Sequence, residues 1–225
     1  SAREGWRIAV SMIYALTKDR TETLDIIRKL ALCEENTAKV QLTMADRRIN
    51  AAPSTSAGRL FDGVSAILGI RTASTFEGEA STALQYRAEA WNKAHPSTDT
   101  IPPEAPEMNA EGFLTLPTDR LVQDILTRRL AGESTDRLAM EFHRRLAGQI
   151  AGAVQAAREQ TGLPAVALSG GVFQNRLLLE LTVELLEQMK FRVLTHHLVP
   201  PNDGGIALGQ AVYGLKRLKL QKNET

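Results

Sequence analysis

Two glycine-rich turns dominate this sequence, and each stands between a short apolar run and an amphipathic helix. The first lies in VALSGGVFQN, from Val166 to Asn175, and the second lies in PPNDGGIALG, from Pro200 to Gly209. Glycines at such turns let a ligand approach the backbone closely, and the free amide hydrogens of the next helical turn attract anions. The pair therefore predicts a phosphate-binding turn beside an acid that binds a cation, which points to nucleotide chemistry.

The first turn offers both backbone and side-chain groups to a ligand. Ser169 stands directly before Gly170 and Gly171, whose backbone could cradle a phosphate. Gln174 and Asn175 follow, and each amide carries donors and an acceptor that suit a base, a ribose or a carbamoyl group. A glycine pair alone is more often only a turn. The two amide side chains are what favour a binding function.

The second turn carries a single acid, Asp203, just ahead of a helical pattern. An aspartate in this place is commonly the N-cap of the helix and needs no ligand. Beside another glycine turn it is equally suited to face a phosphate or a hard cation, because such cations prefer carboxylate oxygen. We therefore predict a metal-binding or phosphate-facing role for Asp203.

Four segments of the chain resemble one known family. STSAGRLFDGVSAILGI spans Ser54 to Ile70 and FEGEA spans Phe76 to Ala80, and SGGVFQNRLL and VPPNDGGIALGQA follow. Their order and spacing are similar to those of the HypF family of hydrogenase maturation carbamoyltransferases, from REGWR near the N-terminus to the last helix. The resemblance implies a helix-rich α/β fold that forms the C-terminal part of an actin-like ATPase (ASKHA) domain, with few strands and long flanking helices. That domain is similar to the tRNA threonylcarbamoyl-transferase family.

The resemblance also implies an activity. Members of the family use ATP and carbamoyl phosphate to form a carbamoyl-adenylate. They then pass the carbamoyl group to the C-terminal cysteine of a partner protein in hydrogenase maturation, as a precursor of the cyanide ligands of nickel-iron hydrogenase. Two alternatives stay open: another actin-like enzyme, such as a tRNA threonylcarbamoyl transferase or a small-molecule kinase, and a non-catalytic docking domain.

The residues that match the family's site can be assigned one by one. The resemblance places Asp62 and Gly78 on the ribose side of the nucleotide, and it makes Asp203 the metal-binding acid. It places Gly170, Gly171 and Asn175 on the phosphate and base side. Independently of the resemblance, the helix that begins at Gly58 and Arg59 places Asp62 off its apolar face. There the carboxylate could accept hydrogen bonds from two ribose hydroxyl groups, or it could simply be a solvated acid. Neither a catalytic base nor the identity of the metal follows from the sequence.

One feature of the family is missing. The family's metal site also uses two histidines four residues apart, and the four histidines here are His95, His143, His196 and His197. His143 is predicted to be a surface residue beside the apolar stripe of a long helix, and the adjacent pair is predicted to be polar residues at a strand end. We therefore expect a fragment of a larger enzyme, inactive alone, that begins partway through its last domain.

The composition is that of an ordinary soluble domain. Of its 225 residues, 43% are hydrophobic and 24% are charged, and the net charge of +1 provides no basic surface for nucleic acid. A single cysteine, Cys33, excludes a disulfide framework, and its apolar neighbours favour a buried thiol over a nucleophile. Neither a signal peptide nor a membrane span is recognisable. We expect a cytoplasmic protein without a nucleic-acid or membrane partner.

Hydrophobic periodicity gives the organisation of the chain. Three amphipathic helices are predicted in residues 1–50, a helical segment expected to pack against the absent half, and residues 51–225 are predicted to form the nucleotide-binding subdomain. The proline-rich stretch from Asn92 to Pro117 reads as a long surface connection with a short strand at 113–116. One helix then ends at Gly132, and another runs from Thr135 to Gly162.

Overall fold

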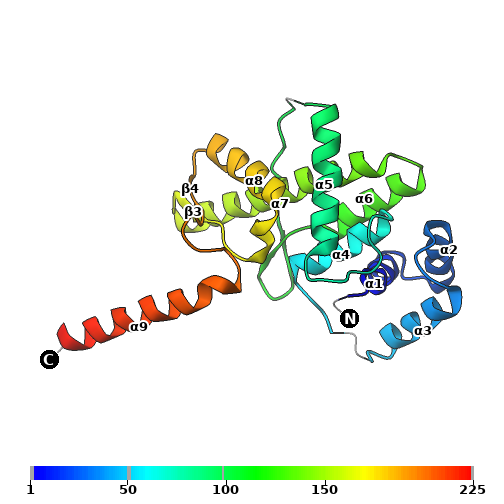
Figure 1. The fold of residues 1–225 in the computed structure, drawn as a ribbon, viewed down its shortest axis with the longest axis horizontal. Coiled ribbons are helices and arrows are strands. Elements are labelled where there is room, and N and C mark those ends of the chain that lie inside the picture. Colours follow the sequence, from blue (N-terminus) through cyan, green and yellow to red (C-terminus); the bar gives the residue numbers. More distant parts are fainter. Residues whose placement is uncertain (1–2, 50–51, 98, 224–225) are drawn as a thin grey trace.

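The chain folds into nine helices and four short strands over residues 3–49, 52–97 and 99–223, the part that the computed structural model describes (Figure 1). The helices are α1 (Gly5–Thr17), α2 (Arg20–Leu30), α3 (Glu35–Asp46), α4 (Ala57–Ile67), α5 (Glu79–Ala94), α6 (Thr118–Leu130), α7 (Thr135–Thr161), α8 (Arg176–Gln188) and α9 (Ile206–Asn223). The strands are β1 (Glu107–Met108), β2 (Leu114–Thr115), β3 (Ala165–Ala167) and β4 (Arg192–Leu194), and two 3₁₀ turns are η1 (Gly171–Gln174) and η2 (Asp203–Gly205). The helix-rich α/β prediction is confirmed.

The main core forms where α5 packs on the long helix α7 and α4 packs on α5. The apolar face of α4 is buried as its spacing predicts, and Phe61 and Val64 are at most 1% exposed. The ring of Phe61 meets that of Phe142 on α7 edge to face, with centroids 5.0 Å apart. This contact joins α4 to α7 directly behind the surface on which the polar residues of α4 lie.

The first three helices belong to the same core, which corrects the expectation that they pack against an absent half. On α1, Ala9, Val10 and Ile13 are fully buried, and α1 packs on α4. Gly63 of α4 makes this packing close, because a Cβ there would collide with the sulfur of Met12. The amphipathic pattern identified the helices correctly. It could not identify which surface covers them.

The proline-rich connection between α5 and α6 lies against α7 and is anchored to it. The backbone nitrogen of Glu104 donates to the carbonyl of Gly148 at 3.0 Å, and Gln149 Nε2 donates to Glu104 Oε2 at 3.0 Å. A Cβ at Gly152 would lie 2.6 Å from the carbonyl carbon of Glu104, so glycine permits this approach. The predicted short strand is β2, which pairs with β1 in an antiparallel hairpin.

The C-terminal part begins with a parallel pair of strands. β3 pairs with β4 in the register Val166 to Val193, and α8 forms the connection between them. A second small core around Leu186 and Phe191 supports this unit.

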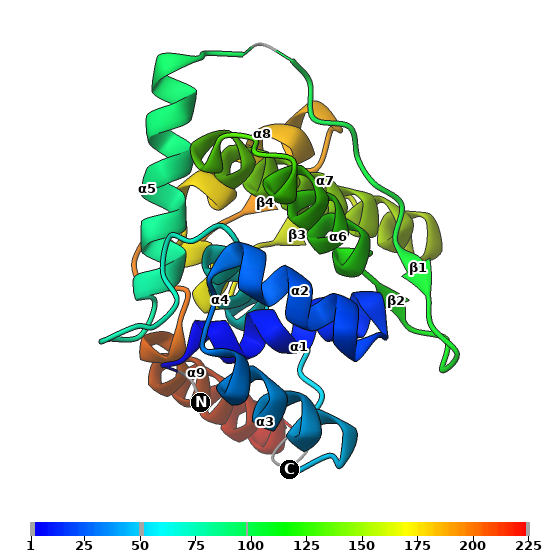
Figure 2. The same cartoon turned by 90° about the vertical axis from the view of Figure 1, so that its right-hand side faces the viewer.

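The last helix, α9, projects away from the other elements (Figure 1) and is called the C-terminal arm below. Figure 2 views the molecule from the side opposite to the arm, so α9 lies in the background there. The large apolar side chains in the described part of the arm are 51–65% exposed: Ile206, Leu208, Val212, Tyr213, Leu215 and Leu218. None of the described helices, the arm included, has the combination of length and apolarity needed to cross a lipid bilayer.

Candidate functional site

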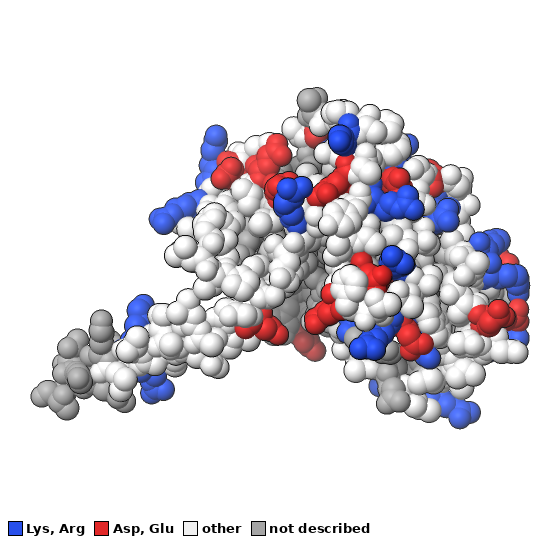
Figure 3. Space-filling view, viewed as in Figure 1, with Lys and Arg blue, Asp and Glu red and all other residues white. Residues whose placement is uncertain are grey.

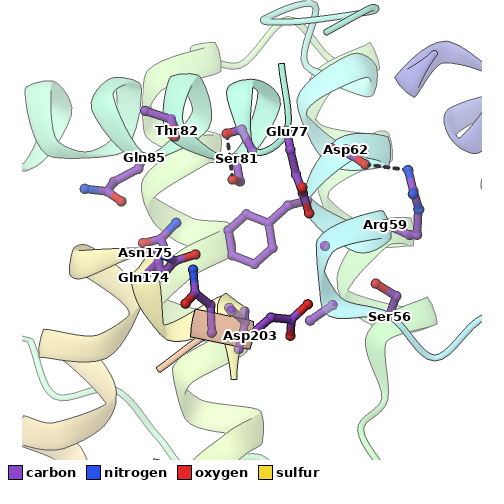
Figure 4. A pocket seen from close by; sticks show the side chains of 17 residues that line it. Ser56, Arg59, Asp62, Glu77, Ser81, Thr82, Gln85, Gln174, Asn175 and Asp203 are labelled. Atoms are coloured by element: carbon purple, nitrogen blue, oxygen red, sulfur yellow. Dashed lines mark hydrogen bonds and ion pairs between the residues drawn. The ribbon is translucent and has the colours of Figure 1, made fainter. Parts of the chain in front are cut away.

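A cleft of about 910 Å³ lies where four segments distant in the sequence meet. Its walls are the first turns of α4 and α5, the η1 turn before α8 and the η2 turn before the arm (Figure 4). The described residues that line it are Ser56, Ala57, Gly58, Arg59, Phe61, Asp62, Glu77, Gly78, Ser81, Thr82, Gln85, Gly171, Val172, Gln174, Asn175, Asn202 and Asp203. The four segments coincide with the four motifs of the sequence.

Most of the residues singled out from the sequence lie in this cleft. The lining includes Asp62, Gly78, Gly171, Gln174, Asn175 and Asp203. Ser169 and Gly170 do not line it. The hydroxyl of Ser169 lies 2.9 Å from His196 Nε2, and the amide of Gly170 donates to the carbonyl of Pro201 at 2.8 Å. Gly170 has φ +101°, so its glycine serves the shape of the turn.

The α4 wall presents a carboxylate held by a neighbouring cation. Asp62 Oδ2 lies 3.1 Å from the Nη1 of Arg59, one helical turn earlier. Partial burial raises the pKa of the Asp62 carboxyl, and Arg59 opposes that effect with a smaller lowering. As predicted, Asp62 lies off the apolar face of the helix. Its second oxygen accepts no bond from any residue that the structure describes.

The α5 wall starts with a glycine and continues as a polar stripe. Gly78 is the N-cap residue of α5 with φ +83°, a conformation that favours glycine. Ser81, Thr82 and Gln85 follow at the spacing of one helical face and also line the cleft. Sequence analysis missed these three. Their signal was the polar spacing that begins at Gly78 inside a helical pattern.

The turn before α5 is closed by Glu79 rather than by its neighbour Glu77. Glu79 Oε2 accepts hydrogen bonds from the backbone nitrogen of Thr75 at 2.6 Å and from its hydroxyl at 3.0 Å. The Thr75 backbone bond is the main reason that the pKa of Glu79 is lowered. Glu77 is exposed and its carboxylate extends into the cleft (Figure 4).

Asn175 is fixed at the base of the cleft by two hydrogen bonds. It caps α8, since its Oδ1 accepts from the backbone nitrogen of Leu178 at 3.0 Å, and its Nδ2 lies 3.0 Å from His143 Nε2. The prediction that His143 is a surface residue is wrong, because its side chain is 0% exposed. α8 and α5 both pack on α7, so a position beside the apolar stripe becomes interior. Burial lowers the pKa of His143 to about 4.

The fourth wall is the η2 turn, in which the cap and the acid are different residues. Asn202, not Asp203, supplies the capping oxygen, which accepts from the backbone nitrogen of Gly204 at 3.0 Å. Asp203 is exposed and extends into the cleft (Figure 4). Among the described residues, none forms a hydrogen bond or ion pair with the Asp203 carboxylate. The carboxylate is therefore available to a ligand.

A metal site cannot be completed from these residues. In residues 3–49, 52–97 and 99–223, no three histidine, cysteine or acidic side chains lie close enough to share an ion. Asp203 offers a carboxylate of the type that hard cations prefer, but a complete coordination sphere would need further ligands. The chain thus fits a metal only as the source of part of its ligand set.

Acidic groups lie on both sides of the cleft, and Figure 3 shows them at the hollow between the arm and the remaining helices. Asp62, Glu77 and Asp203 face a single basic lining residue, Arg59. An anionic ligand would be repelled by this excess of carboxylates unless cations or basic groups from elsewhere offset it. The lining therefore favours the neutral, hydroxyl-rich or amide-bearing parts of a ligand.

The remaining histidines and the cysteine lie away from the cleft. His197 Nε2 is 3.1 Å from the hydroxyl of Thr195, and the ring of His95 stacks on Trp91 at 3.8 Å between centroids. Cys33 is partly buried, and desolvation raises the pKa of its thiol, which suits a packed side chain rather than a nucleophile.

Comparisons with known proteins agree on one relationship. A family model described as "Carbamoyltransferase, Kae1-like Domain, second subdomain" matches residues 1–210. The chain is 30% identical to Carbamoyltransferase HypF2 of Cupriavidus necator, over 96% of this chain and 28% of that protein. It is 37% identical to Carbamoyltransferase HypF of Rhodobacter capsulatus, over 78% of this chain and 22% of that protein.

The fold is also similar to that of a solved structure. It matches the crystal structure of full-length HypF in its phosphate- and nucleotide-bound form with a TM-score of 0.80 and 28% identity, over 96% of this chain and 27% of that chain. The helix-rich arrangement is thus consistent with the predicted C-terminal part of an actin-like fold. The chain spans about a quarter of the length of these relatives.

Proposed function

This chain belongs to the HypF carbamoyltransferase family, as the second subdomain of its Kae1-like domain, and on that premise we propose that its cleft is the nucleotide-binding part of a carbamoyltransferase. The complete enzyme would use ATP and carbamoyl phosphate to form a carbamoyl-adenylate. The carbamoyl group would then pass to the C-terminal cysteine of a hydrogenase maturation partner. The nucleotide in the matched structure of full-length HypF supports the ligand class.

One observation carries the proposal. Four motifs that are spread over about two thirds of the chain, from Ser56 to Asp203, converge on a single polar cleft. Each motif contributes to the lining a polar side chain or a glycine. A purely structural role for the motifs would not require their polar groups to face one another. A cleft of about 910 Å³ also lies within the usual size range of small-molecule sites.

Each wall has a role that its chemistry suits. The Asp62 carboxylate accepts hydrogen bonds from ribose hydroxyls, and the positive φ of Gly78 opens the backbone for the sugar to approach. Gln174 and Asn175 contact the base or the carbamoyl group with neutral amides. Gly171 leaves room beside the η1 turn, since a Cβ there would meet its closest neighbour at 3.9 Å.

Asp203 would contribute one carboxylate to a divalent cation that offsets the phosphate charge, as the resemblance to the family implies. The other ligands would come from parts of the enzyme beyond this chain, so we assign no step of the reaction to the metal. In the transfer step, the carbamoyl carbon–oxygen bond to AMP breaks while a carbon–sulfur bond forms. AMP leaves with the bonding electrons and the cysteine thiol gives up its proton.

Isothermal titration with ATP and Mg²⁺ tests the binding role. We expect the chain to bind, and we expect Asp62→Ala to weaken affinity by about 10- to 100-fold, the usual value of a hydrogen bond to a charged group. Gln174→Ala should weaken affinity by roughly tenfold or less, as for a neutral hydrogen bond. Gln188→Ala is the matched control, because Gln188 is exposed at the far end of α8.

The outcomes separate the alternatives. An ATP affinity that neither Asp62→Ala nor Gln174→Ala changes would contradict the assignment of this cleft as the nucleotide site. A transfer assay with the full-length protein then decides the acceptor, by offering a hydrogenase maturation partner and tRNA in parallel. Label on tRNA would replace our proposal with that of a tRNA-modifying enzyme. Partner binding that is independent of nucleotide would indicate a docking domain.

A further inference from the structure

His143 is the most deeply buried ionisable group beside the cleft, and no role has been assigned to it so far. Its side chain is 0% exposed at a junction of three elements. It lies on α7, its ring meets that of Phe61 on α4 with centroids 5.5 Å apart, and it contacts Asn175 at the start of α8. Phe61 and Asn175 both line the cleft, so His143 stands directly behind its surface.

The hydrogen bonds of His143 settle its tautomer. Nδ1 lies 2.8 Å from the backbone carbonyl oxygen of Ala139. A carbonyl oxygen can only accept, so Nδ1 must carry the proton. In the neutral imidazole Nε2 then has a free lone pair, and its neighbour at 3.0 Å, Asn175 Nδ2, must be the donor.

The orientation of the Asn175 amide follows from two independent contacts that agree. The backbone nitrogen of Leu178 needs an acceptor, which must be Oδ1. Nε2 of His143 needs a donor, which must be Nδ2. A flipped amide would break both bonds at once, since each heavy atom would then meet a group of its own kind. The side chain therefore has one orientation.

This arrangement leaves one hydrogen of Asn175 unused. Nδ2 carries two hydrogens, and among the described residues only His143 accepts from it. We propose that His143 is a positioning residue whose unprotonated Nε2 fixes the Asn175 amide, so that the second Nδ2 hydrogen is offered to an acceptor atom of the ligand in the cleft. The inference rests on the proposed nucleotide-binding function. A base nitrogen, a ribose oxygen or a carbamoyl oxygen is the kind of atom that would accept this bond.

Two substitutions of similar size separate positioning from a purely structural role. Glutamine at 143 places an amide oxygen near the position of Nε2, so His143→Gln keeps the acceptor for Asn175. Asparagine places its amide near the position of Nδ1, so His143→Asn keeps the donor for Ala139 and loses the contact to Asn175. If His143 positions Asn175, glutamine is the conservative variant. If only the hydrogen bond to Ala139 matters, asparagine is the conservative variant.

The first measurement is ATP affinity with Mg²⁺, for the chain and both variants, each checked for cooperative thermal unfolding. We expect His143→Gln to bind within about threefold of the parent and His143→Asn to bind about tenfold more weakly, the value of one neutral hydrogen bond. Asn175→Ala should match His143→Asn or be weaker, because it also removes the cap of α8. The reverse order of the two His143 variants would overturn the proposal.

The second measurement needs no ligand, so it separates this inference from the nucleotide assignment. In ¹⁵N NMR spectra of the parent chain, His143 should show the tautomer with its proton on Nδ1. The Asn175 side-chain amide signals should persist in His143→Gln and shift or broaden in His143→Asn. The positioning role would be refuted, even if ATP binds, by a proton on Nε2 of His143. It would also be refuted if His143→Asn left the Asn175 side-chain signals unchanged. If ATP fails to bind the parent chain while these signals behave as expected, the positioning stands and the nucleotide assignment fails.

Discussion

The helical body around α7 and the C-terminal arm use apolar residues in opposite ways. In the body, Leu84 on α5 and Leu138 on α7 are 0% exposed, and the buried imidazole of His143 is held by two hydrogen bonds. On the arm, Leu215 is 61% exposed and Tyr213 is 65% exposed. Figure 3 shows the described part of the arm as a largely uncharged surface, broken by a few basic side chains.

The difference shows which part of the molecule is self-sufficient. Burial of apolar surface stabilises the body by about 25 cal/mol for each Å² removed from water, and the arm gains little of this within the described structure. The cleft lies at the border of the two regions, because α4, α5 and α8 belong to the body while η2 leads into the arm. Three of its walls are therefore rigidly supported, and the wall that carries Asp203 is supported least.

The largest expected effect comes from the same substitution made in each region. Leu84→Ala should lower the free energy of unfolding by about 2–5 kcal/mol, because it leaves a cavity in a packed core. Leu215→Ala, its match on the arm, should change it by less than about 0.5 kcal/mol. Urea denaturation followed by circular dichroism measures both. A comparable loss from Leu215→Ala would show that the arm is packed in solution and would break the comparison.

The buried imidazole predicts a pH dependence that belongs to the body. His143 has its pKa lowered to about 4 by burial, with Glu89 on α5 as the charged group that opposes the shift. Between pH 6.5 and 4 the unfolded chain binds a proton at His143 that the folded chain does not bind. The free energy of unfolding is therefore unaffected by this group above pH 6.5, and it decreases as the pH falls from 6.5 to 4. The decrease in the free energy of unfolding is on the order of 3 kcal/mol for such a pKa shift.

Comparison with His143→Gln isolates this contribution from that of the carboxylates. The unfolding free energy of the parent chain should fall relative to that of the variant as the pH goes from 6.5 to 4, and the difference should level off below pH 4. Parallel curves for the two proteins over that interval would mean that His143 is accessible to protons in the folded state.

The smallest effects are expected from two glycine-to-alanine substitutions that change stability in opposite directions. Gly152→Ala on α7 should destabilise the chain by about 1–3 kcal/mol, because the new methyl group would displace the connection at Glu104. Gly209→Ala on the arm should instead strengthen its helix by roughly 0.5–1 kcal/mol, since the added Cβ would meet nothing within 4 Å beyond the adjoining backbone of its own helix. Denaturation measures the first change, and amide hydrogen exchange of α9 measures the second. Slower exchange throughout α7 in Gly152→Ala would contradict the close approach.

Local patterns predicted the elements well. The apolar spacing placed α4 and α7 correctly, and Gly162 ends α7 at the position that its pattern suggested, with φ +71°. The extended runs at Val166 and Val193 became β3 and β4. Each of these depends on neighbours within a few residues, which is why sequence alone suffices for them.

The errors share a cause. Periodicity predicts a surface position for His143 and an absent partner for the first three helices, because it reveals that a face is apolar and not what covers that face. The polar stripe that begins at Gly78 was missed for the same reason. Nothing in the spacing of Ser81 and Gln85 distinguishes a solvated helix face from the wall of a cleft.

The sequence by itself therefore determined most of the helices, the glycine turns, the family to which the chain belongs and six of the residues that line the cleft. Only the tertiary structure decided that Gly170 serves the turn while Gly171 faces the cleft, that Asn202 rather than Asp203 is the cap, and that a buried His143 holds Asn175. The first set follows from short-range backbone and side-chain preferences. The second depends on which distant segments meet, and that is determined by the packing of α5 and α8 on α7 and of α4 on α5.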